Sequence, residues 1–61
     1  MNLYKENNTY YIYKDNVYYI ADIVIKGGRT ISVTPSTEYV ENLENPVEMT
    51  YYDVKREFIK W

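Results

Sequence analysis

The sequence contains no cysteine and no histidine. Without cysteine the chain can form neither a disulfide nor a thiolate metal site. Without histidine it also lacks the commonest zinc ligand and the commonest general base of enzymes. Nucleophilic catalysis through a Ser-His or Cys-His pair is therefore excluded. We expect a protein that binds no cofactor and no metal and acts by contact, with catalysis as the weakest alternative.

Long apolar runs and secretion signals are also lacking. No run of apolar residues approaches the length that crosses a bilayer. The opening segment, Met1 to Glu6, shows no basic stretch followed by an apolar one, which is the pattern of a signal peptide. We therefore expect a cytoplasmic protein that makes no contact with a membrane.

The chain is also short, and its 61 residues predict a single domain over 1–61. A chain of this size buries only about 60% of the surface that its unfolded form exposes. Its 46% hydrophobic residues and nine tyrosines nevertheless argue for a folded protein rather than a disordered one. Because disulfides and thiolate metal sites are excluded, extra stability has to come from oligomerisation or a partner. We expect a homodimer, a complex with another protein, or both.

The net charge of −2 is unevenly distributed along the chain. Residues 36–54 contain five acidic and no basic side chains, whereas 1–35 carry a net charge of +1 and 55–61 one of +2. A protein that binds nucleic acid normally shows a basic patch, and the sequence predicts none. We therefore expect a protein rather than a nucleic acid as the partner.

The first half of the chain is rich in β-branched and aromatic residues, which favour strands. Asp15-Asn16 predicts a turn because both residues tolerate a left-handed backbone, and Gly27-Gly28 predicts another. Pro35 is expected to end the last strand because it cannot donate a ladder hydrogen bond. The sequence predicts an α+β protein with a three-stranded antiparallel β-meander, its strands at about 9–13, 17–26 and 29–34.

The alternation of side chains predicts how the second and third strands pair. A three-residue loop of 27–29 sets Ile25 opposite Ile31 and Ile23 opposite Val33. A two-residue loop would instead set Val33 opposite an aspartate. We prefer the first alternative because it places apolar side chains against one another.

A two-residue Asp15-Asn16 turn extends the same face into the first strand. It pairs Ile12 with Tyr19, and Tyr10 with Ala21. The predicted core face then consists of Tyr10, Ile12, Tyr19, Ala21, Ile23, Ile25, Ile31 and Val33.

The segment 36–49 predicts a short helix followed by a connector. Ser36 or Thr37 can cap a helix over about 37–44, and Asn45-Pro46 would end it. Apolar residues at helical spacing support this interpretation. Residues 47–49 fit either an extended connector or a short edge strand.

A C-terminal amphipathic helix is predicted at about 50–60. Thr50 precedes Asp53 by three residues, which is a variant of the capping box. An acidic residue in the first turn and Lys60 near the end suit the helix dipole. The apolar stripe, which we expect to pack on the core face of the sheet, consists of Tyr51, Val54, Phe58 and Trp61.

The second face of the predicted sheet is unusually apolar. A solvated face normally carries polar residues at alternate positions, and an exposed apolar patch usually marks a contact surface. Three explanations remain open: cover by the helix of 37–44, homodimerisation through the sheet or an edge strand, and recognition of another protein. The residues of this face are Tyr11, Tyr13, Tyr18, Ile20, Asp22 and Val24.

Tyrosine suits recognition because its large rigid ring ends in a polar group. The glutamates of 37–44 recur every three residues along the predicted short helix and could steer a partner electrostatically. A solvated helix face is the simplest interpretation of these carboxylates, and they lack the loop pattern of a calcium site. The candidate partner-binding residues are Tyr11, Tyr13, Tyr18, Ile20, Asp22, Glu38, Glu41 and Glu44.

A very small domain rich in Asn, Tyr and Lys and lacking cysteine resembles the accessory proteins of bacteriophages and mobile elements. The resemblance implies an inhibitor that binds a host or defence protein stoichiometrically. A regulator that stacks single-stranded nucleic acid on the tyrosines is one alternative. A dimer that sequesters a small molecule is another.

Overall fold

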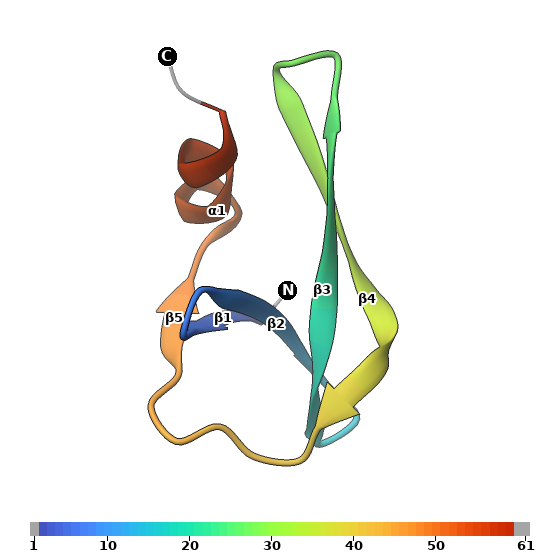
Figure 1. Cartoon of the computed structure of the whole chain (residues 1–61), viewed down its shortest axis with the longest axis vertical. Helices are drawn as coiled ribbons and strands as arrows, with labels where there is room; N and C mark the ends of the chain where they lie inside the picture. The colour runs from blue at the N-terminus through green and yellow to red at the C-terminus, as the bar shows by residue number, and fades with distance from the viewer. Residues whose placement is uncertain (1, 60–61) are drawn as a thin grey trace.

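The computed structural model describes residues 2–59 and contains five strands and one helix (Figure 1). The strands form one antiparallel sheet in the order β4-β3-β2-β1-β5. The predicted three-stranded meander with an extra helix is therefore wrong. The elements are β1 (Leu3–Glu6), β2 (Thr9–Lys14), β3 (Val17–Lys26), β4 (Thr30–Val40), β5 (Val47–Met49) and α1 (Tyr51–Phe58).

The first hairpin, β1–β2, was missed by the sequence analysis. Its turn is Asn7-Asn8, with φ angles of 51° and 68°, and the turn between β2 and β3 is Asp15-Asn16, with 53° and 66°. Two successive left-handed residues match the twist of a two-residue hairpin. The two turns use the same backbone chemistry, so Asn7-Asn8 was a readable signal for β1.

The predicted pairing of the strands is confirmed where both partners lie in a ladder. The loop of β3–β4 has three residues, 27–29, and its glycines adopt φ angles of 62° and 69°. The confirmed pairs are Ile12 with Tyr19, Ile23 with Val33, and Ile25 with Ile31.

β2 separates from β3 halfway along β3. The last pair of the β2–β3 ladder is Tyr11 with Ile20, so the expected pairing of Tyr10 with Ala21 is not part of it. From Ala21 to Lys26, β3 is paired only with β4. This half of β3 and its partner form a two-stranded ribbon that extends past the other strands (Figure 1).

Residues 37–40, which we expected at the start of a helix over 37–44, complete β4 instead. Tyr39 lies opposite Tyr19 and Val40 opposite Tyr18. An isolated helix of eight residues has little stability of its own, and the pairing of this segment with β3 prevails over its helical spacing. Residues 41–46 form the connection to β5 and contain no helix.

A bulge in β4 explains why Pro35 does not end the strand. Pro35 lies opposite Ala21 and Tyr39 lies opposite Tyr19, so residues 36–38 face a single residue of β3. Bulges occur at sheet edges, and proline is tolerated on an edge strand because no neighbour needs its missing N–H group. β4 is an edge strand of this sheet.

The segment 47–49, which the sequence left undecided, is the short edge strand β5. It pairs with β1, with Met49 opposite Leu3 and Val47 opposite Lys5. Because β1 was not predicted, this segment had no expected partner strand.

α1 begins with the predicted capping box. The Thr50 side chain accepts a hydrogen bond from the Asp53 amide at 3.1 Å, and the Asp53 carboxylate accepts one from the Thr50 amide at 3.0 Å. The predicted contributions of Lys60 and Trp61 lie outside the described residues. Between residues 2 and 59, no helix has the length and hydrophobicity needed to cross a membrane.

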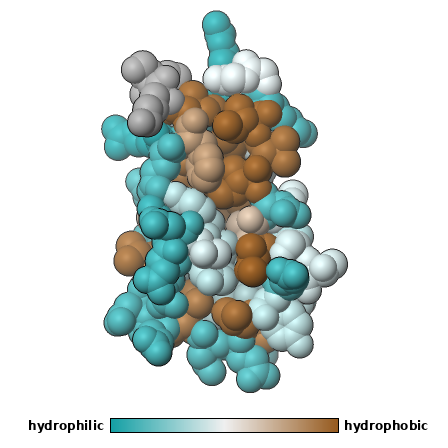
Figure 2. Space-filling model, viewed as in Figure 1, coloured by the Kyte–Doolittle hydropathy of each residue, from teal (hydrophilic) through white to brown (hydrophobic). Residues whose placement is uncertain are grey.

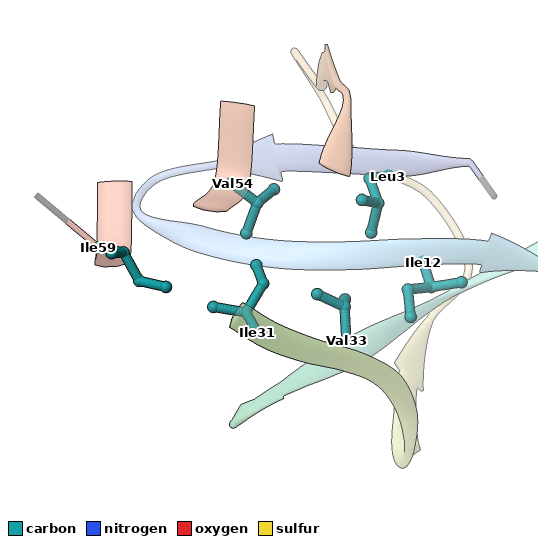
Figure 3. Close-up of a cluster of buried hydrophobic side chains, with 6 residues drawn as sticks. All are labelled: Leu3, Ile12, Ile31, Val33, Val54 and Ile59. Atoms are coloured by element: carbon teal, nitrogen blue, oxygen red, sulfur yellow. The ribbon is translucent and has the colours of Figure 1, made fainter. Parts of the chain in front are cut away.

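The core lies between α1 and the face of the sheet that we expected to be buried. Val54 of α1 is completely buried (0% exposed) and converges on the sheet residues in Figure 3. Tyr10, Ala21 and Ile23 are partly buried against this cluster. The buried core consists of Leu3, Ile12, Ile31, Val33, Val54 and Ile59.

Two residues of the predicted core face lie outside the buried cluster. Ile25 is 49% exposed because it lies near the end of the ribbon. Tyr19 is half-buried and packs against Tyr39, with 5.6 Å between the ring centroids. The predicted face is correct at both positions, but the core does not extend along its whole length.

The hydroxyl of Tyr51 attaches α1 to the outer edge of β4. It donates a hydrogen bond to the Ile31 carbonyl at 2.7 Å and accepts one from the Ile31 amide at 3.3 Å. One side chain thus satisfies both backbone groups that a further strand would have bonded at this position.

We predict that Val54→Ala lowers the free energy of unfolding by about 2 kcal/mol, because it removes two buried methyl groups and leaves a cavity. Urea unfolding measures the effect. Tyr52→Ala is the matched control, since Tyr52 is on the same helix and 72% exposed. It should change the free energy by less than about 0.5 kcal/mol. Equal effects of the two substitutions would contradict the position of α1.

Candidate functional site

The sheet face opposite α1 carries the tyrosines that the sequence analysis singled out. Tyr11 lies opposite Ile20, and Tyr13 lies opposite Tyr18. β1 adds Tyr4, which lies opposite Tyr11. Val40 of β4 lies opposite Tyr18. We call Tyr4, Tyr11, Tyr13, Tyr18, Ile20 and Val40 the tyrosine face.

Three rings of the tyrosine face pack against one another. Tyr4 meets Tyr18 edge to face, with ring centroids 5.6 Å apart and planes at 82°. Tyr4 meets Tyr13 in the same way, at 6.5 Å and 84°. The rings of Tyr13 and Tyr18 are 4.8 Å apart and tilted by 51°. These distances and angles are favourable for aromatic pairs, so each ring restricts the movement of the others.

The tyrosine face is in contact with solvent. Its tyrosines and Ile20 are half-buried, and Val40 is 37% exposed. Within residues 2–59, the hydroxyls of Tyr4, Tyr13 and Tyr18 make no hydrogen bond, and none of them is buried. Since an exposed hydroxyl bonds water, these groups can exchange water for a partner.

No described helix covers the tyrosine face. α1 packs on the core side of the sheet, and the helix expected over 37–44 does not exist. The connection 41–46 runs along the end of the molecule opposite the β3–β4 loop (Figure 1). The Asn45 amide donates a hydrogen bond to the Glu6 carboxylate, which ties this connection to the end of β1.

The acidic candidates do not form the row that a helix would give. Glu38 lies in the bulge of β4, and Glu41 and Glu44 lie in the connection to β5. All three are exposed. Asp22 is exposed on the same side of β3 as Ile20, two residues further along. Their contact with a partner stays a prediction.

A polar cluster on the other side of the sheet was missed by the sequence analysis. The Lys5 ammonium lies 2.8 Å from the Glu57 carboxylate and 5.2 Å from the centre of the Tyr10 ring. The Tyr10 hydroxyl donates a hydrogen bond to the same carboxylate. The ring of Tyr10 also packs on Phe58 at 5.4 Å. The cluster therefore connects β1 and β2 to the end of α1.

Lys5, Tyr10 and Glu57 shift one another's pKa values. The hydrogen bond from Lys5 holds the pKa of Glu57 below its ordinary value, and the same bond raises the pKa of Lys5. Partial burial, and then the bond to Glu57, raise the pKa of Tyr10. The charged pair and the neutral phenol are thus the stable forms near neutral pH. The three side chains therefore connect β1 and β2 to α1, and each pKa is shifted away from neutral pH.

Surface hollows are present outside the tyrosine face. Between residues 2 and 59, no group of three or more carboxylates could hold a metal ion. One surface hollow of about 350 Å³ is lined mainly by polar residues of the β1–β2 turn and the connection 41–46. Another, of about 400 Å³, lies beside β5 and the start of α1. Neither is lined by a residue of the tyrosine face.

Comparison with known proteins assigns no family to the chain. No family model matches the sequence, and no curated protein or solved structure is similar enough to count as a match.

Sequence reasoning missed two members of the tyrosine face. Tyr4 was missed because β1 was not predicted, although Asn7-Asn8 marks the turn that follows it. Val40 was assigned to a helix, and only its pairing with Tyr18 places it here. The local sequence therefore contained a signal for Tyr4 but none for Val40.

We predict that Glu57→Gln reduces the loss of stability in acid. Because the pKa of Glu57 is lowered by folding, its contribution is complete above the ordinary value of 4.5 and is lost as the pH falls through the folded-state pKa. In urea unfolding from pH 7 to pH 3, the free energies of unfolding of wild type and variant should converge below about pH 4.5.

Lys5→Gln should remove part of the same dependence, because the bond from Tyr10 also lowers the pKa of Glu57. The double variant should behave as Glu57→Gln does. Some acid sensitivity remains in every variant because the bonds from Thr50 also lower the pKa of Asp53. If wild type and Glu57→Gln differed in free energy of unfolding by the same amount from pH 7 to pH 3, the proposed ion pair would be contradicted.

Proposed function

We propose that this chain is a small non-catalytic interaction protein that inhibits another protein by stoichiometric binding through the tyrosine face. One observation carries the proposal. The rings of Tyr4, Tyr13 and Tyr18 pack against one another on a face that no described helix covers, and their hydroxyls are not buried and make no hydrogen bond within residues 2–59.

Interlocked rings favour binding because they are already ordered. A side chain that becomes fixed at an interface costs about 0.5–1.5 kcal/mol of conformational entropy. Tyr13 and Tyr18 have lost much of this freedom before a partner arrives, because each packs on the other and on Tyr4. Their rings offer large apolar contact with a polar rim, which is the combination found in many recognition surfaces.

The acidic residues near this face support one kind of partner. Glu41 follows Val40 directly, and Glu38 precedes it by two residues on the same strand. Exposed charges at the rim of an interface raise the rate of association and select against partners of like charge. We therefore propose a partner whose binding surface is apolar at its centre and basic at its edge.

The class of target is proposed from a resemblance in size and composition. The resemblance to accessory proteins of bacteriophages and mobile elements supports a host or defence protein of the cytoplasm as the target. In such a role the inhibitor occupies the surface that the target needs for its own activity. One copy of the face per target would be sufficient, and no catalytic group is required.

The two other functions that we considered gain no specific support. Stacking of single-stranded nucleic acid requires cations beside the aromatic rings. Lys5 instead lies on the α1 side of the sheet and pairs with Glu57, and Lys26, which shares the side of the tyrosine face, lies at the far end of β3. Sequestration of a small molecule requires an enclosed apolar pocket. The two surface hollows lie away from the tyrosine face.

We predict that Tyr13→Ala combined with Tyr18→Ala weakens binding to the inhibited protein by about 100-fold or more, because two central aromatic contacts are lost. The partner is first captured with the tagged wild-type chain, and the affinities are then compared by calorimetry. Tyr52→Ala is the matched control, since it removes a more exposed tyrosine on α1.

The double Tyr→Phe variant at positions 13 and 18 keeps the rings and separates loss of contact from loss of folding. It should fold as the wild type does and bind more tightly than the double alanine variant. Full binding by a folded double alanine variant, or equal weakening by Tyr52→Ala, would refute the proposal.

A further inference from the structure

The outer edge of β3 is open along its second half. Beyond Ala21, β3 pairs with β4 on one side only, and no other strand among residues 2–59 pairs with it. Near the β3–β4 loop, β4 lies toward α1 and β3 lies on the far side (Figure 1). The open edge therefore faces away from the helix.

Two residues direct their backbone hydrogen-bonding groups out of this edge. The bonds from Tyr51 to the Ile31 amide and carbonyl show that these groups point away from β3. In an antiparallel ladder, Ile25 opposite Ile31 must then point its own groups away from β4. The same holds two residues back, at Ile23 opposite Val33.

Pro35 supports this assignment independently. It lies opposite Ala21, two residues further along the same ladder. At a position whose N–H group points out of the sheet, proline removes no hydrogen bond between β3 and β4. The alternation derived from Tyr51 and Ile31 therefore continues along the ribbon.

The open stretch has an apolar centre, and its only protective feature is the pair of charges at its ends, Asp22 and Lys26. Proteins protect edges with proline, bulges, short strands, charged side chains or covering elements. The edge of β4 has Pro35, a bulge and the Tyr51 hydroxyl, and β5 has only three residues. The open stretch of β3 instead exposes Val24 (54%) and Ile25 (49%). Hydrophobic residues gather over this hairpin in Figure 2.

The sequence of the stretch is complementary to itself. It reads Asp22-Ile23-Val24-Ile25-Lys26, with an acidic residue two before its centre and a basic residue two after it. When two copies run antiparallel about a two-fold axis at Val24, Asp22 of each copy lies opposite the partner's Lys26. We propose that this segment is a homodimerisation edge through which two copies of the chain join their sheets.

The register also fits the hydrogen-bonding groups. Ile23 lies opposite the partner's Ile25, and both residues direct their amides and carbonyls into the interface. Antiparallel pairs of this type exchange two hydrogen bonds. The two registers displaced by two residues keep this backbone match but separate the charges, placing Asp22 opposite Val24 or opposite a glycine. Only the register centred on Val24 matches both backbone and charge.

The side chains of this interface follow from the same register. Asp22 and Lys26 lie on the same face of the sheet as Val24, because side chains alternate along a strand. Within residues 2–59, neither charged side chain makes a hydrogen bond or an ion pair. Each is therefore available to the second copy.

A two-fold arrangement also closes the edge. Each copy uses its open stretch once, so the contact yields a dimer and no filament. A five-residue strand pair is small for a stable interface, and the dimer should dissociate on dilution. We expect the change from monomer to dimer at protein concentrations between about 10 µM and 1 mM. The inference does not require the partner-binding role of the tyrosine face.

The test is a pair of charge reversals measured by sedimentation equilibrium at low ionic strength. Wild type should reach twice the monomer mass of 7.4 kDa as its concentration rises. Asp22→Lys alone and Lys26→Asp alone each oppose like charges twice per dimer and should weaken dimerisation about ten-fold. An equimolar mixture of the two variants should dimerise again, because every contact then joins opposite charges.

Lys14→Asp is the matched control, since it makes the same change of charge at an exposed residue away from the edge. It should dimerise as wild type does. A monomeric wild type up to about 1 mM would overturn the proposal. So would dimers that the single reversals leave intact, or reversals whose mixture stays monomeric.

Discussion

β3 has ten residues and β2 has six, and much of the structure depends on this difference. Because β2 separates after Ile20, the second half of β3 forms a ribbon with β4 alone. α1 packs beside this ribbon, buries Val54 against the core and bonds the backbone of Ile31 through Tyr51. A chain without disulfides thus obtains its core by packing one capped helix on the strands. The same divergence leaves the far edge of β3 open.

The two proposed surfaces are continuous along β3. Tyr18 and Ile20 of the tyrosine face are followed on the same side of the strand by Asp22 and Val24. A two-fold axis through Val24 would therefore place the tyrosine faces of both copies on one side of a continuous sheet. Two linked faces bind a target that presents two sites far more tightly than one face does. Dimerisation and inhibition are separate proposals, and this geometry would make them reinforce each other.

Local chemistry predicted the parts of the fold that depend on neighbouring residues. The turn at Asp15-Asn16, the loop at Gly27-Gly28 and the capping box at Thr50 are all present. The failures involve pairing between distant segments. Val40 joined β4 rather than a helix because β3 offered it a partner, and helical spacing alone could not reveal that. The Asn7-Asn8 turn was readable, and with it β1, Tyr4 and a partner for β5 would have followed.

Backbone amide hydrogen exchange, followed by NMR at two protein concentrations, tests the central claim that β2 leaves the edge of β3 open. In dilute protein the amides of Ile23 and Ile25 should exchange much faster than that of Val24, which faces β4 in the ladder. At high concentration the two isoleucine amides should become protected. Protection of Ile23 and Ile25 equal to that of Val24 at every concentration would show that the edge is occupied within one chain, and would contradict the account.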